Sequence, residues 1–437
     1  MNLYAGMRAR ETPVGVALIG AGKFGAMFLN RARHTPGLRL IGIADLNVDQ
    51  AGRTMAQAGW DDAKTPVTDD AEDLIARDGV EIVIEATGHP AAGLRHAATA
   101  IREGRHLIMV NVEADVLAGP LLARDARAAG LVYSLAYGDQ PALIAELVDW
   151  GRAAGFKIVC AGKGTKYLPA FHQSTPETVW SHYGVTPEEA KAGGMNPKMF
   201  NSFLDGTKSG IEMAAVANAT GLTPPDDGLG FPPVGCHELS EVLKPQSDGG
   251  QLPAPGMVEV VSSLARDGSP VADDLRWGVY VTMTVGDDYA ARCFREYGMA
   301  TDASGRYTAM WKPYHLIGLE LGISVASIAV RGEPTGSPQA FRGDAVAVAK
   351  RDLKVGELLD GEGGATVWGK LVPAQRSLGE SLLPIGLAQD IALRHDVGAG
   401  QALRWADVVI DDNDPAVRTR RAMENTIGPQ GQRETAA

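Results

Sequence analysis

The sequence predicts an α/β protein with a doubly wound parallel sheet first, an α+β domain next and a small β-rich domain last. Strands and helices alternate from residue 14 to about residue 150, which is the pattern of a parallel sheet with helices on both faces. From residue 344 onward, short apolar runs and glycine turns replace that alternation and show no helical period. The expected boundaries are 1–150, 151–335 and 340–412, followed by a flexible tail at 413–437.

Charge and composition exclude several classes of partner and compartment. The 437 residues carry 41 Lys and Arg against 53 Asp and Glu, a net charge of −12, which argues against nucleic acid or an anionic membrane as a partner. The three cysteines are too far apart for a zinc site or a disulfide framework. The N-terminus has no apolar run of signal-peptide length, and the longest apolar stretch, 316–330, is too short to cross a bilayer. We therefore expect a cytoplasmic protein.

A glycine motif follows the first predicted strand, Val14–Ile19. The segment Gly20-Ala-Gly-Lys-Phe-Gly25 has the spacing G-x-G-x-x-G, and helical spacing follows it. Gly20 allows a tight turn, Gly22 lets a pyrophosphate approach the backbone, and Gly25 lets the helix pack closely. The helix N-terminus, which begins at Lys23 and Phe24, would hold the phosphates. The motif therefore predicts a dinucleotide-binding Rossmann domain.

The ends of three further strands supply the other predicted cofactor contacts. Asp45 ends the strand 38–44, twenty residues after Gly25, where a carboxylate binds the ribose hydroxyls of the adenosine half. The strand 81–85 leads to Thr87 and Gly88, and the strand 106–110 leads to Asn111 and Glu113. Ligands in such sheets bind at the carboxyl ends of the strands. Glu113 either holds a lysine or a metal ion there, or caps the next turn.

The chain from about residue 155 onward has a less regular pattern of strands and helices. We expect a strand at 156–161 that runs into a glycine- and lysine-rich turn at 162–167, a long helix at 196–220, loops over a site at 221–256, an apolar helix at 315–330 packed on the first domain, and a linker at 331–338. Proline at the start and glycine at the end support the long helix.

The motifs resemble those of known families. Residues 14 to about 330 resemble the homoserine dehydrogenase-like Rossmann oxidoreductases, through the segments Gly20–Gly25, Ala86–Gly88, Gly138–Pro141, Gly162–Tyr167 and Asp205–Lys208. Residues 344–411 resemble a SAF domain, the β-clip module of sialic-acid synthases and antifreeze proteins, at Lys350–Glu357 and Asp396–Gly400. The combination resembles the DXR-like (DRL) reductoisomerase family. This resemblance implies conversion of 1-deoxy-D-xylulose 5-phosphate to 2-C-methyl-D-erythritol 4-phosphate in isoprenoid precursor synthesis, and we expect a homo-oligomer.

The candidate catalytic residues are lysines and carboxylates of the middle region. Asp205, Lys208 and Glu212 share one face of the predicted long helix, and homoserine dehydrogenases use an aspartate and a lysine from a comparable helix. Lys163 and Lys166 flank a glycine-threonine turn that would bind an anionic substrate such as a sugar phosphate. The alternatives are a surface Lys–Glu pair on the helix and a solvated basic turn. The SAF-like module would support assembly or cover the site, and its Lys350-Arg351 pair is as easily a solvated turn.

The sequence offers alternatives for the metal ligands and for the cofactor. In reductoisomerases an Asp-x-Glu near Asp139 binds the metal, but this chain has Asp139-Gln-Pro141, so Mn²⁺ or Mg²⁺ would need Glu238 or another carboxylate. His172 and His237 are candidate acid/base or phosphate groups. The resemblance implies NADP, which we expect as the cofactor, and the alternative is NAD, which Asp45 favours by repelling a 2′-phosphate. The rival functions are a homoserine or sugar-acid dehydrogenase or oxidoisomerase, and a non-catalytic protein that binds NAD(P) and carbohydrate.

Overall fold

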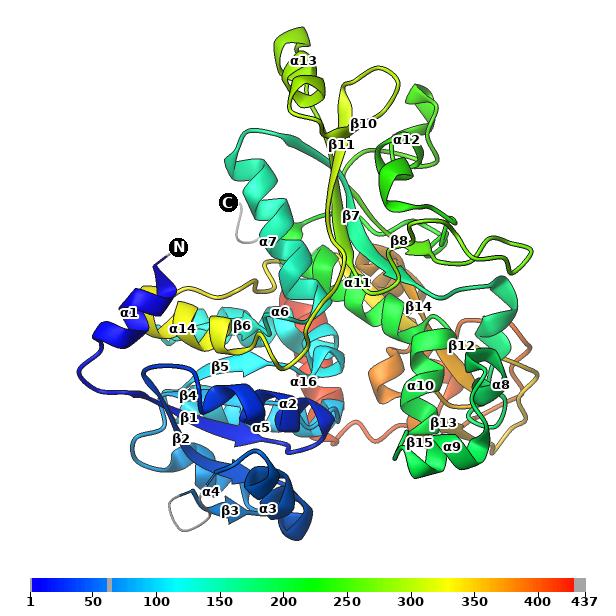
Figure 1. Cartoon of the computed structure of the whole chain (residues 1–437). Coiled ribbons are helices and arrows are strands. Elements are labelled where there is room, and N and C mark those ends of the chain that lie inside the picture. Colours follow the sequence, from blue (N-terminus) through cyan, green and yellow to red (C-terminus); the bar gives the residue numbers. More distant parts are fainter. Residues whose placement is uncertain (1, 61–64, 428–437) are drawn as a thin grey trace. The chain divides into compact units, whose positions relative to one another are not determined.

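Figure 1 presents the computed structural model of the chain, which describes residues 2–60 and 65–427. The chain divides into two compact units. Unit 1 holds the described parts of 1–146, 315–340 and 413–437, and unit 2 holds 147–314 and 341–412. The chain therefore returns to unit 1 twice, which differs from the predicted series of three consecutive domains. Among the described residues, no helix is long and apolar enough to span a membrane.

Unit 1 is built on a parallel sheet, as the alternation of strands and helices predicts. Its described strands have the order β3-β2-β1-β4-β5-β6, and every neighbouring pair is parallel. The strands are β1 (Val14–Ile19), β2 (Leu38–Ala44), β3 (Val67–Thr68), β4 (Ile82–Glu85), β5 (His106–Met109) and β6 (Tyr133–Leu135). Strand β1 is buried along its whole length, because helices cover both faces of the sheet. The predicted doubly wound Rossmann sheet is confirmed.

The helices of unit 1 alternate with its strands, as expected. They are α1 (Leu3–Ala9), α2 (Lys23–Ala32), α3 (Val48–Gln57), α4 (Ala71–Ala76), α5 (Pro90–Arg102), α6 (Val112–Ala128), the first half of α7 (Gln140–Ala153), α14 (Gly322–Arg331) and α16 (Pro415–Ile427). Helix α6 begins at Val112, because Asn111 caps it, and it kinks at Ala118, two residues before Pro120. Helix α14 packs on α1 and α2, so the predicted docking of this apolar helix on the first domain is confirmed.

The predicted linker at 331–338 packs on the edge of the sheet in unit 1. The backbone N–H of Leu135 in β6 donates to the carbonyl oxygen of Gly336 at 2.8 Å. The hydroxyl of Thr335 donates to the carbonyl of Leu135 at 2.9 Å. This segment therefore extends the edge of the sheet rather than connecting two free domains.

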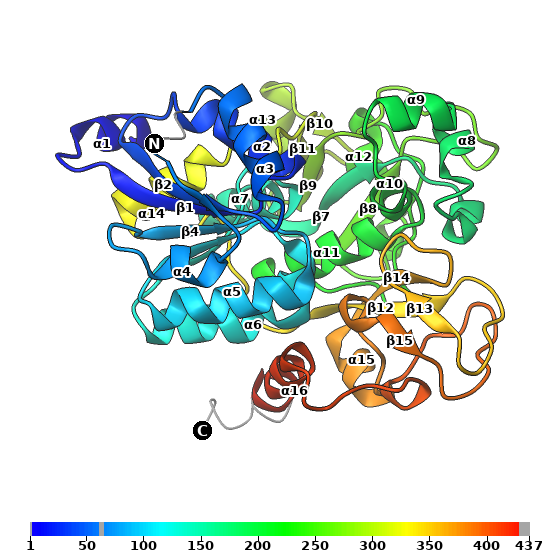
Figure 2. The same ribbon diagram turned by 90° about the horizontal axis from the view of Figure 1, so that it is seen from below.

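Helix α16 corrects the prediction of a flexible tail from residue 413. Its buried side chains include Val417 and Met423, and the buried Arg420 guanidinium bonds the Glu424 carboxylate at 2.8 Å. Val417, Arg420 and Met423 are spaced by three, so they lie on one buried stripe of the helix, which packs on α5 and α6 (Figure 2). The polar composition concealed this stripe in the sequence. The remaining predicted tail, 428–437, lies outside the described residues.

Unit 2 contains a mixed sheet with the order β10-β11-β9-β7-β8. The strands are β7 (Lys157–Thr165), β8 (Met257–Ser262), β9 (Val279–Thr284), β10 (Ala300–Thr301) and β11 (Tyr307–Lys312). Strand β7 continues to Thr165, so most of the glycine- and lysine-rich segment predicted to be a turn is a central strand. A Cβ atom at Gly162 would lie 1.7 Å from the Glu259 carbonyl oxygen, and therefore this glycine permits close pairing with β8.

The long helix predicted at 196–220 is two helices, α10 (Pro197–Leu204) and α11 (Thr207–Thr220). Gly206 between them has φ +94°, a left-handed conformation that ends α10 and redirects the chain. The other helices of unit 2 are α8 (Val179–Tyr183), α9 (Pro187–Ala192), α12 (Leu239–Val242), α13 (Asp288–Glu296) and α15 (Ala374–Glu380).

The C-terminal region, residues 341–412, is β-rich as predicted. It contains two small antiparallel sheets, one of β12 (Gly343–Ala349) and β14 (Val367–Pro373), and one of β13 (Leu358–Asp360) and β15 (Gln389–Ala392). Strands β12 and β14 pack on α11. The Asn218 amide of α11 bonds the backbone of Arg342 and Gly343. This region therefore belongs to the core of unit 2.

Candidate functional site

The glycine motif of unit 1 forms an open cradle at the start of α2. Gly20 has φ +96°, and a Cβ atom there would lie 2.6 Å from the Ala86 carbonyl oxygen. A Cβ atom at Gly25 would lie 2.5 Å from the Gly20 carbonyl oxygen. At Gly22, by contrast, no described atom lies within 4 Å of the Cβ position. The loop thus keeps an open approach to the first N–H groups of α2, which begins at Lys23 and Phe24, and a pyrophosphate fits there.

Asp45 lies at the carboxyl end of β2 and is fixed beside this cradle. Its carboxylate accepts the backbone N–H of Ala21 at 2.8 Å and that of Asn47 at 2.9 Å. A carboxylate oriented by two backbone groups can accept hydrogen bonds from the two hydroxyls of a ribose. The position predicted from the sequence is therefore suited to the adenosine half of a dinucleotide.

The ends of β4 and β5 come together as predicted. The Thr87 hydroxyl donates to Glu85 at 2.5 Å. The Asn111 side-chain amide donates to the Thr87 hydroxyl at 3.4 Å and to the His89 carbonyl at 3.0 Å. The neighbouring Gly88 has φ +69° and is exposed, while Glu113 is buried in the first turn of α6.

Glu85 is a residue of this network that the sequence analysis did not single out. Its side chain is fully buried; one oxygen is 3.2 Å from His96 Nδ1, and the other has no hydrogen-bond partner among the described residues. The signal in the sequence was a carboxylate at the end of an apolar strand. Glu85 orients Thr87 at the strand end, where the nicotinamide side of a dinucleotide is expected.

In unit 2, strand β7 and helix α11 bring a lysine and a carboxylate together. The Lys163 ammonium bonds the Glu212 carboxylate, and the two side chains are 8% and 5% exposed. Lys208 lies one turn before Glu212 on α11 and is half-buried, so these two residues share a face of the helix. The structure thus gathers three of the five predicted catalytic residues around one buried ion pair.

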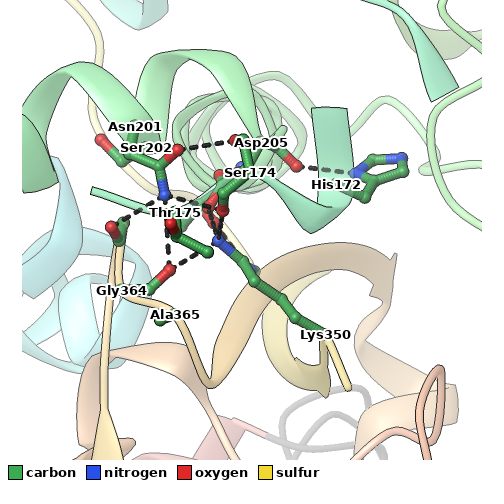
Figure 3. Close-up of polar contacts among 12 residues, drawn as sticks. His172, Ser174, Thr175, Asn201, Ser202, Asp205, Lys350, Gly364 and Ala365 are labelled. Atoms are coloured by element: carbon green, nitrogen blue, oxygen red, sulfur yellow. Dashed lines mark hydrogen bonds and ion pairs between the residues drawn. The ribbon is translucent and has the colours of Figure 1, made fainter. Parts of the chain in front are cut away.

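Asp205 does not share this face, which corrects the prediction. It ends α10, on the other side of Gly206, and its buried carboxylate accepts the Thr207 N–H at 2.8 Å and the Lys350 ammonium at 2.7 Å. Burial raises the pKa of Asp205, although Lys350 opposes that shift. Lys350, for which a solvated turn was one alternative, is therefore a buried partner of Asp205 (Figure 3).

Lys166 follows β7 and is half-buried. Its ammonium bonds the carbonyl oxygen of His182 at 2.5 Å, and burial together with nearby Arg276 lowers the pKa of Lys166. A lysine with a cation beside it favours an anion as a third partner. This arrangement fits the predicted anion-binding role of the segment better than a fully solvated turn does.

His172 lies in a defined aromatic environment. Its Nδ1 is 2.6 Å from the Asp205 carbonyl oxygen, its Nε2 is 2.9 Å from the Tyr167 hydroxyl, and its ring stacks on Trp368. Because a carbonyl can only accept, Nδ1 carries the proton and Nε2 accepts from Tyr167. Burial lowers the pKa of His172, which keeps the ring neutral near pH 7.

The described residues do not provide the predicted metal site. Asp139 is buried and accepts the backbone N–H of Gln140 at 2.8 Å. Glu238 is exposed and accepts the backbone N–H of Gly235 at 3.0 Å, and the nearby His237 is exposed with its ring against Trp311. Within residues 2–60 and 65–427, no group of three His, Cys, Asp or Glu side chains is arranged to hold a metal ion.

Two family models match the chain. Residues 19–133 match the NAD-binding domain of homoserine dehydrogenase, and residues 138–321 match the catalytic domain of the oxidoreductase DRL. No curated protein sequence matches the chain significantly. The resemblance of residues 344–411 to a SAF domain stays a prediction.

Solved structures of oxidoreductases are similar at low sequence identity. A homoserine dehydrogenase from Thiobacillus denitrificans matches 90% of this chain and 98% of its own, with 13% identity and a TM-score of 0.45. A DOX-P reductoisomerase in complex with magnesium matches 48% of this chain and 58% of its own, with 16% identity and a TM-score of 0.33. An NAD-binding oxidoreductase from Klebsiella pneumoniae matches 37% of this chain, with 20% identity and a TM-score of 0.29, and this chain spans about half of it, 47%.

Because these TM-scores are low, the family rests on the two sequence models and on the glycine cradle that unit 1 presents. The first model contains the motif and Asp45, and the second contains Lys163, Lys208 and Glu212. The chain belongs to the NAD(P)-dependent oxidoreductases that join a homoserine dehydrogenase-type NAD-binding domain to a DRL catalytic domain.

Proposed function

We propose that the protein transfers hydride between a nicotinamide dinucleotide and a carbon that bears a ketone or hydroxyl in an anionic, sugar-phosphate-like substrate. The observation that carries the proposal is the buried Lys163–Glu212 pair, with Lys208 on the same helix face. A buried ammonium stabilises the negative charge that develops on a ketone oxygen during reduction, because the low local dielectric strengthens that interaction.

Each of the three lysines has a separate role in the proposed reaction. The nicotinamide, when bound, supplies the hydride. Lys163, held by Glu212, stabilises the developing alkoxide, and Lys208 donates the proton that converts this oxygen to a hydroxyl. Lys166, with Arg276 beside it, binds the anionic end of the substrate.

Within this class, our specific proposal is reduction and isomerisation of 1-deoxy-D-xylulose 5-phosphate. The family match to the DRL catalytic domain and the three lysines near the end of β7 and the start of α11 support it. The rival is oxidation of a homoserine-like or sugar-acid hydroxyl by the same groups acting in reverse. The cytoplasmic location and the homo-oligomer stay predictions.

For the cofactor, we propose a preference for NAD over NADP, contrary to what the family resemblance implies. The Asp45 carboxylate is fixed by two backbone N–H groups, so it cannot turn away from a 2′-phosphate without losing them. The test is the ratio of kcat/KM for NADH and NADPH in the wild type and in Asp45→Ser. We expect NADH to be favoured at least tenfold and the variant to lose that preference. A wild type that prefers NADPH contradicts the cofactor proposal.

The activity is tested by following cofactor oxidation with 1-deoxy-D-xylulose 5-phosphate, its unphosphorylated form, and a panel of sugar acids and amino-acid alcohols. Each is assayed with and without Mn²⁺ or Mg²⁺. Turnover that needs the phosphate supports the specific proposal. Turnover on a sugar acid or an amino-acid alcohol instead supports the rival dehydrogenase. Tight cofactor binding without turnover on any compound contradicts the proposed activity.

Lys208 offers a direct test of the proposed proton donor. Lys208→Ala should reduce kcat at least a hundredfold without a change in the far-UV circular dichroism spectrum, because the residue is half-buried on a helix surface. The matched control is Lys191→Ala, which alters an exposed lysine in the last turn of α9. Retention of most of the activity by Lys208→Ala would remove Lys208 from the mechanism.

A further inference from the structure

The C-terminal region inserts a lysine into the core of unit 2. Lys350 follows β12, and its ammonium makes three hydrogen bonds: to the Asp205 carboxylate at 2.7 Å, to the Ser174 carbonyl at 2.7 Å and to the Gly364 carbonyl at 2.6 Å. The side chains of Lys350 and Asp205 are 2% and 0% exposed. All three donor protons of the ammonium are therefore satisfied inside the protein (Figure 3).

Asp205 connects this lysine to the helix that carries the proposed catalytic groups. One carboxylate oxygen accepts from Lys350, and the other accepts the backbone N–H of Thr207, the first residue of α11. The Thr207 hydroxyl in turn accepts the backbone N–H of Gly369 in β14 at 2.8 Å. The first turn of α11, which contains Lys208, is therefore fixed from two sides by groups of the C-terminal region.

A second network fixes the preceding segment in the same way. The Asn201 side chain is fully buried, and its amide donates to the carbonyls of Ser174 at 3.1 Å and Gly363 at 2.9 Å. A Cβ atom at Gly363 would lie 2.0 Å from the Lys198 carbonyl oxygen, so the two backbones are in close contact. The C-terminal region thus contacts both helices, α10 and α11, at the point where the chain turns between them.

The ion pair between Lys350 and Asp205 is buried, and its burial determines what the pair contributes. A buried ion pair contributes little net stability relative to an apolar pair of the same size, because both charges lose their hydration. Removal of one partner, however, leaves an unpaired buried charge. The pair therefore allows one docking arrangement and penalises others, which is the property needed to hold a reactive lysine in one place.

We propose that the C-terminal region is an intramolecular positioning element, in which Lys350 acts through Asp205 to hold the start of α11 and thereby the proton-donating Lys208. Lys350 is a positioning residue and does not touch the substrate. The inference rests on the proposed function for its effect on turnover, whereas its effect on α11 is independent of any substrate.

The test compares four variants of the full-length chain by hydrogen exchange, thermal unfolding and steady-state kinetics. Lys350→Met removes the charge, Lys350→Arg keeps it, and Lys350→Met with Asp205→Asn removes both charges. Lys354→Met is the matched control, because Lys354 is 74% exposed in the same region and pairs with Asp396 at the surface.

We expect Lys350→Met to lower the Tm by roughly 10 °C and to speed exchange at the start of α11 at least tenfold. The value of kcat should fall at least tenfold while the KM for the cofactor stays within about twofold. The double variant should recover most of the Tm, because no unpaired charge remains, but not kcat, because the clamp is lost. Lys350→Arg should retain a higher Tm and a higher kcat than Lys350→Met. Lys354→Met should match the wild type.

The pH dependence separates the charge effect from loss of packing. Asp205 already has a raised pKa because it is buried, and loss of Lys350 raises it further, so the folded variant takes up a proton that the unfolded chain releases. The stability of Lys350→Met should therefore fall relative to the wild type as the pH rises above about 4, the pKa of an aspartate in the unfolded chain. The other titratable groups around this cluster are Tyr167, Tyr183, Lys370 and His172. Lys350 lowers the pKa of His172, so its removal also raises that pKa, and Asp205→Asn in the double variant isolates the contribution of Asp205.

Two outcomes overturn the inference. Unchanged exchange at the start of α11 in Lys350→Met would show that Asp205 does not transmit the constraint. A loss of stability independent of pH, not recovered by the double variant, would show that Lys350 acts by packing alone. If no substrate is turned over by the wild type, the proposed function fails, but the exchange and stability results still decide the positioning of α11.

Discussion

The candidate site of unit 1 is made of backbone groups, whereas that of unit 2 is made of side chains. In unit 1 the dinucleotide cradle is made of backbone: glycines at 20, 22 and 25 and the N–H groups that begin α2. In unit 2 the groups are side chains from distant segments, as Lys163 on β7 and Glu212 on α11 illustrate. A backbone site is encoded by neighbouring residues and is visible as a motif. A side-chain site depends on which strands and helices pack together, which spacing does not reveal.

The largest expected effect lies in unit 2, where charges are buried. Glu212→Ala leaves the Lys163 ammonium unpaired, and we expect the free energy of unfolding to fall by about 4 kcal/mol. The double variant Lys163→Met with Glu212→Leu should recover most of that loss, because neither charge remains. Urea unfolding monitored by circular dichroism measures both. Equal losses in the single and double variants would mean that packing, and not charge, dominates this site.

The next effect lies in unit 1 and depends on backbone conformation. Gly20→Ala places a Cβ atom 2.6 Å from the Ala86 carbonyl oxygen at φ +96°, and we expect a loss of about 3 kcal/mol in the free energy of unfolding. The same urea measurement applies. A stability within about 0.5 kcal/mol of the wild type would show that the turn relaxes easily and is not a rigid cradle.

Asp115 is a buried carboxylate in unit 1, and it tests how burial of a charge affects stability outside unit 2. Asp115 accepts a hydrogen bond from the Tyr133 hydroxyl at 2.8 Å, and burial raises the pKa of Asp115 to about 7. The folded state therefore holds a proton that the unfolded state releases, so this stabilising effect is complete at low pH and is lost as the pH rises through about 7. We expect wild-type stability to fall by about 2 kcal/mol relative to Asp115→Asn between about pH 5 and pH 8. A pH-independent difference would contradict this assignment.

The smallest effect on stability should come from Gly22→Ala. No described atom lies within 4 Å of the Cβ position, so the Tm should change by less than about 2 °C. The methyl group would nevertheless occupy the approach of the pyrophosphate, and we expect the Kd for NAD⁺ to rise about tenfold, or about 1.4 kcal/mol. Calorimetric titration measures this Kd, with Gly52→Ala in α3 as the control, because no described atom lies within 4 Å of the Cβ position there either. An unchanged Kd would move the pyrophosphate away from Gly22.

The positions of the residues in the glycine cradle could be predicted from the sequence, because neighbouring residues encode a backbone site. The motif, Asp45, Thr87 and Asn111 occupy the places expected from strand ends in a parallel sheet. The placement of Lys208 and Glu212 on one face of a helix was also predicted, because their spacing of four residues sets it, while their catalytic role stays a prediction.

The predictions that failed involve contacts across long sequence distances. Asp205 was grouped with Lys208, because Gly206 was not recognised as a break between two helices. The burial of Lys350 was not predicted, since its partner lies 145 residues earlier in the chain. The stripe of α16 was hidden by polar neighbours. Tertiary packing decided each of these cases, and local composition carried no signal of it.

The central claim is that unit 1 binds the cofactor and the Lys163–Glu212 pair of unit 2 performs the chemistry. The most direct test measures NADH affinity and single-turnover hydride transfer in the wild type and in Glu212→Gln, which keeps the size of the side chain. The account predicts the same Kd for NADH in both proteins and a rate of hydride transfer at least a hundredfold lower in the variant. A variant that transfers hydride at the wild-type rate would contradict it.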